Sequence, residues 1–155
     1  MRKPVHYAAA CIGPEPLKIL VAAGGNLREA DKKKINCLHI AAMRGRAHNI
    51  RTILTEQPDM IKIRDKQSMT AMGYACKFGH IEAVKTLIEF NAKKNASCGK
   101  ERFTPLCFAA AYGHHELTQT LLALKARVLG KDKFKRTPLI LAVRNGHTKI
   151  ASLLL

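Results

Sequence analysis

A six-residue motif recurs along this chain at nearly constant spacing, and that spacing limits the possible folds more than any other feature. The second residue of each copy falls at position 5, 38, 72, 106 or 139, so successive copies are 33 or 34 residues apart. A fixed period of about 20–50 residues is typical of repeat proteins, in which each repeat packs mainly on its neighbours. We therefore expect a stacked solenoid whose thin core is shared between layers.

Each copy of the motif predicts a short helix. In the fourth copy the hydroxyl of Thr104 can cap the helix, Pro105 fits its first position, and Gly113 can end it with a left-handed backbone. A second helix is then expected to begin near His114, with leucines on one face at helical spacing. The five copies are Pro4–Ala9, Cys37–Ala42, Ala71–Cys76, Pro105–Ala110 and Pro138–Val143.

The motif resembles that of the ankyrin repeat family, which reads Thr-Pro-Leu-His-x-Ala-Ala followed shortly by Gly-His. The resemblance covers nearly the whole chain and implies an all-α repeat solenoid, with stacked helix-turn-helix units joined by β-hairpin-like fingers. It also implies a single ankyrin repeat domain over residues 1–155. The implied repeats span approximately residues 3–34, 35–68, 69–102, 103–135 and 136–155.

Two repeats depart from the family pattern. In the first, Ile12 stands in place of the turn glycine and two prolines follow, so the second helix is expected to begin near Pro16. In the second, Pro58 replaces the glycine that usually follows the second helix. The last repeat is truncated and ends in the apolar run 153–155, although solenoids need polar terminal repeats. We therefore expect the chain to be a fragment of a longer protein.

The net charge is the most unusual feature of the composition. The chain has 27 Lys+Arg against 11 Asp+Glu, a formal charge of +16. Such a balance predicts attraction to acidic partners and says nothing about the fold. Most of the excess lies in the predicted fingers, where residues 28–34, 62–68, 93–102 and 125–136 carry +2, +2, +3 and +5.

The basic residues of the fingers fall in register. In each finger we number as slots one to six the six residues that end at the capping position of the next helix, for example residues 31–36. The second slot is lysine in every finger. The fourth slot, usually glycine in the family, is basic in three of the four fingers. Because helical layers stack about 8–10 Å apart, the four lysines should form a row roughly 25–30 Å long. The second-slot residues are Lys32, Lys66, Lys100 and Lys133, and the fourth-slot residues are Lys34, Ser68, Arg102 and Lys135.

The resemblance also implies a concave groove beside the fingers, lined by the ends of the first helices. Arginine and aromatic residues are the side chains that most often become interface hot spots. Phe134, at a tip where polar residues are usual, is expected either to tuck against the neighbouring finger or to anchor a partner. The candidate partner-binding residues are the four second-slot lysines together with Lys34, Arg44, Lys77, Phe78, Arg102, Tyr112, Phe134, Lys135 and Arg144.

No catalytic, cofactor or metal site is expected. Five of the seven histidines occupy repeat positions whose side chains, in the family, hydrogen-bond the neighbouring loop: His6, His39, His80, His114 and His147. The five cysteines form no Cys-x-x-Cys pair, so neither a disulfide framework nor a zinc site is indicated. We interpret Cys37, Cys76 and Cys107 as buried thiols. The sequence also lacks phosphate-binding glycine loops and hydrolase motifs.

The leading hypothesis is a non-catalytic protein–protein interaction scaffold that binds an acidic or phosphorylated segment through its basic face. Binding of nucleic acid or another polyanion is the alternative. It is supported by the charge, but for nucleic acid it is opposed by the shortage of aromatic residues near the fingers, where only Phe103 and Phe134 occur. The chain could also be the targeting module of a larger enzyme or channel. The competing interpretation of the lysine row is a set of well-solvated loop tips with no binding role. We expect a monomeric domain, cytoplasmic or nuclear, with no membrane span.

Overall fold

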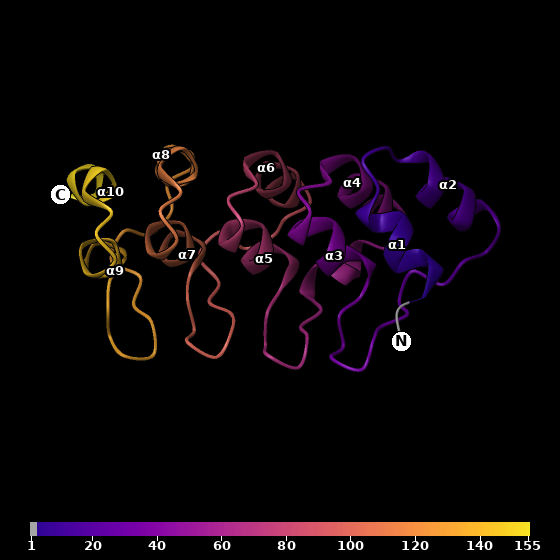
Figure 1. The fold of residues 1–155 in the computed structure, drawn as a ribbon, viewed down its shortest axis with the longest axis horizontal. Coiled ribbons are helices and arrows are strands. Elements are labelled where there is room, and N and C mark those ends of the chain that lie inside the picture. Colours follow the sequence, from indigo (N-terminus) through magenta and orange to yellow (C-terminus); the bar gives the residue numbers. More distant parts are fainter. Residues whose placement is uncertain (1–2) are drawn as a thin grey trace.

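The computed structural model describes residues 3–155 and shows two rows of short helices stacked along one axis, with the two ends of the chain at opposite ends of the stack (Figure 1). The inner row lies next to the fingers and the outer row lies away from them. The inner helices are α1 (Pro4–Ala10), α3 (Cys37–Met43), α5 (Ala71–Lys77), α7 (Pro105–Ala111) and α9 (Pro138–Arg144). The outer helices are α2 (Glu15–Ala22), α4 (Ala47–Glu56), α6 (Ile81–Glu89), α8 (His115–Ala123) and α10 (Thr148–Leu154). The predicted all-α repeat solenoid is confirmed.

Side-chain caps start the inner helices α3, α5, α7 and α9. The Thr104 hydroxyl accepts a hydrogen bond from the backbone N–H of Cys107 at 3.2 Å, and Pro105 is the first residue of α7. Thr70 and Thr137 cap α5 and α9 in the same way, and Asn36 caps α3. These caps satisfy backbone N–H groups that have no partner within the helix.

Small side chains at the centre of the inner helices let the layers approach closely. The central alanines are at most 5% exposed, because the inner helices pack against one another and against the outer helices. Cys37, Cys76 and Cys107 are fully buried in the same core, as interpreted from the sequence. Larger side chains at the alanine positions would cost about 1–3 kcal/mol each by overpacking. The alanines are Ala8, Ala41, Ala75, Ala109 and Ala142.

The fingers are tight turns joined to one another by main-chain hydrogen bonds. In three of them an aspartate (Asp31, Asp65 or Asp132) accepts two backbone N–H groups, from the residues two and four positions later. Within residues 3–155, extended pairing is limited to two isolated bridges, Ala30–Asn36 and Cys98–Phe103. Successive fingers are linked by the hydrogen bonds Lys66 N to Lys33 O, Gly99 N to Ser68 O and Lys133 N to Glu101 O, at 2.9, 2.9 and 3.0 Å.

Histidines connect consecutive layers, as the resemblance implies. At the far end of the inner helices, Nε2 of His80, His114 and His147 lies 3.0, 2.8 and 3.2 Å from a backbone carbonyl oxygen of the preceding repeat. At the finger end, Nε2 of His6 and His39 lies 3.1 and 3.2 Å from the carbonyl oxygens of Ile35 and Ile63. The expected structural role of these five histidines is confirmed.

The two irregular repeats are accommodated locally. The second helix of the first repeat, α2, starts at Glu15 with proline in its first turn, close to the predicted start at Pro16. In the second repeat, α4 ends at Glu56 and a 3₁₀ turn, η1 (Pro58–Lys62), follows it. This turn buries Met60, which is 1% exposed, against the core. The proline at position 58 is compatible with it because proline fits the first position of a helical turn.

Candidate protein-binding surface

The residues predicted to bind a partner lie on two adjoining parts of one face, which we call the finger-side face. It consists of the finger tips, which project from the inner row of helices (Figure 1), and the exposed residues at the C-terminal ends of those helices. Lys77 and Tyr112 at the helix ends line one pocket together with Lys100 of a finger. At the helix ends, Arg44, Phe78, Tyr112 and Arg144 are exposed and Lys77 is half-buried. At the tips, the exposed residues are Lys32, Lys34, Lys66, Lys100, Arg102, Lys133, Phe134 and Lys135.

The four second-slot lysines differ in their partners. Lys133 forms an ion pair with Glu101 of the neighbouring finger, 3.0 Å between Nζ and Oε1. Within residues 3–155, none of the other three (Lys32, Lys66, Lys100) has a carboxylate within 4.0 Å, so their ammonium groups face solvent. The second-slot lysines of the first three fingers therefore have no ion-pair partner among the described residues, whereas that of the fourth finger is partly neutralised.

The fourth-slot residues adopt a left-handed backbone in all four fingers. Their φ angles are +59° at Lys34, +61° at Ser68, +56° at Arg102 and +62° at Lys135. Glycine adopts this conformation freely, whereas a residue with a Cβ pays roughly 1–2 kcal/mol. The finger thus keeps the turn that glycine would make but places an exposed side chain there, which is basic in three of the four fingers.

Phe134 is an exposed apolar side chain at the tip of the fourth finger. Its ring is 58% exposed, with Nζ of Lys133 4.8 Å and Cζ of Arg136 4.7 Å from the ring centroid. Both distances are within the range of cation–π attraction. Of the two interpretations drawn from the sequence, this position favours an exposed side chain over one tucked against the neighbouring finger.

Aromatic rings and a lysine alternate along the helix ends. Nζ of Lys77 lies 5.5 Å from the ring centroid of Tyr112 and 6.0 Å from that of Phe78. Phe78 stacks at 6.4 Å on His80, and Tyr112 stacks at 6.5 Å on His114, so the layer-connecting histidines support both rings. Phe78 and Tyr112 are each 48% exposed, which leaves about half of each side chain available for contact.

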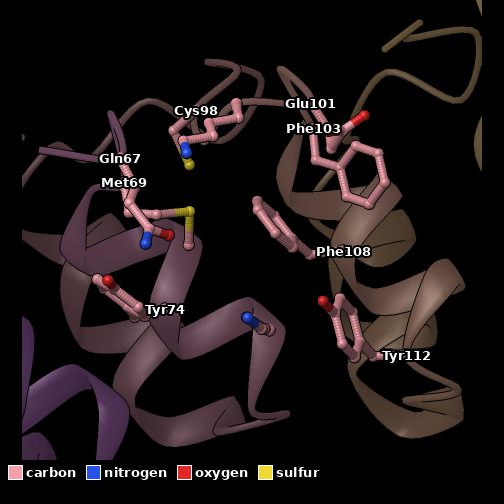
Figure 2. A pocket seen from close by; sticks show the side chains of 11 residues that line it. Gln67, Met69, Tyr74, Cys98, Glu101, Phe103, Phe108 and Tyr112 are labelled. Carbon is pink, nitrogen blue, oxygen red and sulfur yellow. The ribbon is translucent and has the colours of Figure 1, made fainter. Parts of the chain in front are cut away.

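A small pocket opens beside this aromatic array, between the third and fourth repeats. We call it the inter-repeat pocket, and its volume is about 220 Å³. Figure 2 shows Met69 and Tyr74 on one side of it, facing Phe108 and Tyr112 on the other. The remaining lining residues are Gln67, Lys77, Cys98, Gly99, Lys100, Glu101 and Phe103.

Sequence reasoning found Lys77, Lys100 and Tyr112 but missed the pocket that brings them together. Its signal was present in two glycines that replace repeat residues: Gly73 stands in the histidine slot of the motif, and Gly99 stands in the aspartate slot of the third finger. A Cβ at Gly73 would lie 2.3 Å from Sγ of Cys98, and one at Gly99 would lie 2.9 Å from Sδ of Met69.

Burial favours the neutral form of three core cysteines and of His39. Burial raises the pKa of the Cys37 thiol to about 12 and also raises the pKa of the Cys76 and Cys107 thiols. Since the thiolate is the nucleophile and the metal ligand, these cysteines are structural. Burial lowers the pKa of His39 below its ordinary value. Between residues 3 and 155 no three His, Cys, Asp or Glu side chains gather as a metal site would require.

Family comparison agrees with the architecture. The family model for ankyrin repeats in three copies matches residues 5–98 and again residues 92–155. No curated protein sequence matches the chain. None of the helices in the described part of the chain is both long and apolar enough to cross a membrane. With the repeated helix pairs, capped inner helices and layer-connecting histidines, the match over nearly the whole length shows that this chain belongs to the ankyrin repeat family.

Proposed function

We propose that this chain is a non-catalytic scaffold that binds an acidic or phosphorylated protein segment along its finger-side face. Ankyrin repeats are in general protein–protein interaction modules. The observation that carries the more specific proposal is the placement of three unpaired tip lysines, Lys32, Lys66 and Lys100, on the same face as exposed Phe78 and Tyr112. We treat residues 1–155 as one binding domain.

Charge and aromatic residues would serve different steps of binding. Positive charge at the tips attracts an acidic segment over a distance of about 8–10 Å at physiological salt, and so speeds association. Once the segment is in place, Phe78 and Tyr112 bury their exposed halves against it and slow dissociation, since aromatic residues near the centre of an interface carry much of its binding energy. Rim charges act mainly on the association rate and on its salt dependence.

We consider nucleic acid the weaker alternative because few aromatic rings are exposed at the finger tips. Single-stranded nucleic acid is bound without sequence preference by combining a basic groove with aromatic rings on which successive bases stack. Of the two aromatic residues near the fingers, Phe103 is only 9% exposed and packs edge-on against Phe108 at 5.2 Å between ring centroids. At the finger tips this leaves Phe134, and the other exposed rings of the face, Phe78 and Tyr112, lie at the helix ends rather than along the lysine row.

A peptide selection tests the proposal. A random peptide library is selected against the protein and against Lys32→Glu/Lys66→Glu/Lys100→Glu, and the enriched peptides are sequenced. The matched control is Lys18→Glu/Lys85→Glu/Lys149→Glu, which makes the same change in net charge on the outer helices α2, α6 and α10. We expect enrichment of Asp, Glu or phosphorylated residues by the protein and by the control, and loss of that enrichment with the tip variant.

Two outcomes contradict the proposal. Equal loss in both triple variants would mean that net charge alone drives binding, and the finger-side face would then have no special role. Absence of acidic enrichment, together with oligonucleotide binding whose affinity falls steeply with salt, would favour nucleic acid instead. A phosphorylated copy of an enriched peptide, compared with its Glu counterpart, distinguishes phosphate from carboxylate as the preferred anion.

A further inference from the structure

The inter-repeat pocket has the size and lining of a site for one side chain. Sites for cofactors and drug-sized ligands are about 300–1,000 Å³, and this one is about 220 Å³. Its inner part is apolar, with Met69, Cys98, Phe103 and Phe108 all at most 9% exposed. Tyr112 forms the outer wall on the same side as Phe108, with their rings stacked at 6.4 Å between centroids. An apolar side chain entering from solvent would therefore meet sulfur and aromatic carbon.

The third finger, which lines the pocket, is built differently from the others. In the other three fingers an aspartate at the first slot accepts two backbone N–H groups of its own turn, whereas the third finger has Gly99 there with φ at +77°. Met69 packs directly on the bare Cα of Gly99, and Cys98 packs on that of Gly73. The sulfur atoms of Met69 and Cys98 thus occupy the space that the two missing side chains leave, and both residues line the pocket.

The mouth of the pocket is positively charged. Lys77 and Lys100 line it, and Glu101 is the one carboxylate among its lining residues. Glu101 is already engaged, since its oxygens lie 3.0 Å from Nζ of Lys133 and 3.8 Å from Nη2 of Arg136. The nearby Asp65 is buried and accepts the hydroxyl of Tyr74 as well as two backbone N–H groups. Neither carboxylate neutralises Lys77 or Lys100, so the mouth of the pocket keeps its positive charge.

An apolar interior under a cationic mouth fits a particular kind of ligand. We propose that the inter-repeat pocket receives a single large apolar side chain from an acidic protein segment, with acidic residues on both sides of it paired to Lys77 and Lys100. This inference rests on the proposed function and adds to it the residue that fixes the register of the segment. Acidic residues alone could slide along the lysine row, whereas an anchored side chain sets one position.

The experiment uses defined peptides in place of the unknown partner. The probe is a fluorescein-labelled peptide with one phenylalanine between two runs of glutamate, and its partner peptide has alanine in place of the phenylalanine. Affinities are measured by fluorescence anisotropy. Burial of a large apolar side chain predicts that the alanine peptide binds roughly tenfold to hundredfold more weakly.

A matched pair of variants locates the contact. Tyr112→Ala removes the outer wall of the pocket, and Phe78→Ala removes a ring of equal exposure that lies on the same face but does not line the pocket. We expect the difference between the two peptides to shrink to at most a few-fold in Tyr112→Ala and to persist in Phe78→Ala, because only residues in contact are coupled. Far-ultraviolet circular dichroism verifies that both variants keep their helix content.

The other possible outcomes overturn either the pocket proposal alone or the proposed function together with it. Equal affinity for the two peptides, with binding still weakened by the tip-lysine variant, overturns the pocket and leaves the proposed function standing. A peptide difference that persists unchanged in Tyr112→Ala also overturns the pocket, since the apolar residue then binds elsewhere. Failure of both peptides to bind, or binding indifferent to the tip lysines, overturns the proposed function and this inference with it.

Discussion

The first inner helix and the later ones end in different ways, although the same groups need partners in each. The last carbonyl groups of any helix lack partners within it and must be satisfied from outside. At the ends of α3, α5 and α7, a turn glycine takes a left-handed backbone and the histidine of the next repeat binds one carbonyl. At the end of α1 no such glycine follows, and α4 supplies different side chains.

At the interface between the first and second repeats, Asn49 binds the carbonyl groups at the end of α1. It is fully buried, and its Nδ2 lies 3.4, 3.1 and 3.1 Å from the carbonyl oxygens of Ala8, Ala9 and Cys11. Arg46, in the place of the later histidines, donates through Nε to the carbonyl of Ala10 at 3.0 Å. In both cases the carbonyl groups at the end of the inner helix are bound by side chains of the next repeat, but the side chains differ. A turn without glycine is therefore tolerated when longer side chains of the next repeat bind these carbonyl groups.

The largest expected effect comes from blocking a regular interface. Gly79 has φ at +75°, and a Cβ there would lie 2.6 Å from Nδ1 of His114. Gly79→Ala should therefore destabilise the protein by roughly 2–4 kcal/mol, through backbone strain and displacement of the histidine together. The measurement is the midpoint of urea unfolding.

Two further glycines separate these causes. Gly146 has the same φ of +75° with open space around it, so Gly146→Ala should cost only the strain, roughly 1–2 kcal/mol. Gly13, in the irregular first turn, has neither a left-handed backbone nor a close neighbour, and Gly13→Ala should change stability by less than about 0.5 kcal/mol. Equal effects at all three positions would contradict the distinction between regular and irregular turns.

The first interface should depend strongly on the buried side chain of Asn49. Asn49→Ala leaves the carbonyls of Ala8 and Ala9 buried without the amide that binds them, which should cost roughly 2–3 kcal/mol. His48→Ala, an exposed neighbour on the same helix, serves as the control and should be nearly neutral. If Asn49→Ala unfolded at the same urea concentration as the control, the proposed replacement of the glycine turn would be wrong.

Acid should weaken the finger-end histidine contact. Because burial lowers the pKa of His39, the unfolded chain takes up a proton at a higher pH than the folded one. The contribution of neutral His39 is fully present above the unfolded pKa of about 6.5 and is lost as the pH falls below it. We expect a lower urea midpoint at acidic than at neutral pH, with a smaller difference in His39→Gln. An equally large difference in that variant would assign the effect to other groups.

The smallest expected effect is a gain in stability at the finger tips. Lys135 has φ at +62°, so Lys135→Gly relieves strain at the cost of greater freedom in the unfolded chain. We expect a net stabilisation of about 0.5–1 kcal/mol. The same substitution at Lys133, whose φ is not left-handed, should not stabilise, and a gain there would refute the assignment of strain to the fourth slot.

The regular part of the fold could be predicted because each repeat carries the same kinds of residue at the same positions. Thr104 before Pro105 specifies a cap, and the histidines at fixed offsets from the turn glycines specify layer contacts, so local chemistry and period agree. The role of Asn49 could not be predicted, because the carbonyl groups that it binds lie about 40 residues earlier. The sequence shows that the first turn is irregular, but it does not show which side chain binds the carbonyl groups there. The inter-repeat pocket likewise depends on what Met69 and Cys98 do in the space that two glycines leave.

The position of the lysine row could be predicted, but its electrostatics could not. Register places Lys32, Lys66, Lys100 and Lys133 in equivalent slots, whereas the ion pair of Lys133 depends on Glu101 lying in the third slot of the preceding finger. The burial of Phe103 was also hidden, because a finger residue one position before the capping threonine can point either to the core or to solvent.

The hydrogen bonds that join successive fingers use main-chain atoms on both sides. A link of this kind is indifferent to which side chains the tips carry, apart from the conformational demand at the fourth slot. Residues at the tips can therefore be exchanged one at a time while the frame that spaces them stays intact. Such a surface can drift from one ligand to another through viable intermediates, and it invites redesign by recombining finger tips without touching the core.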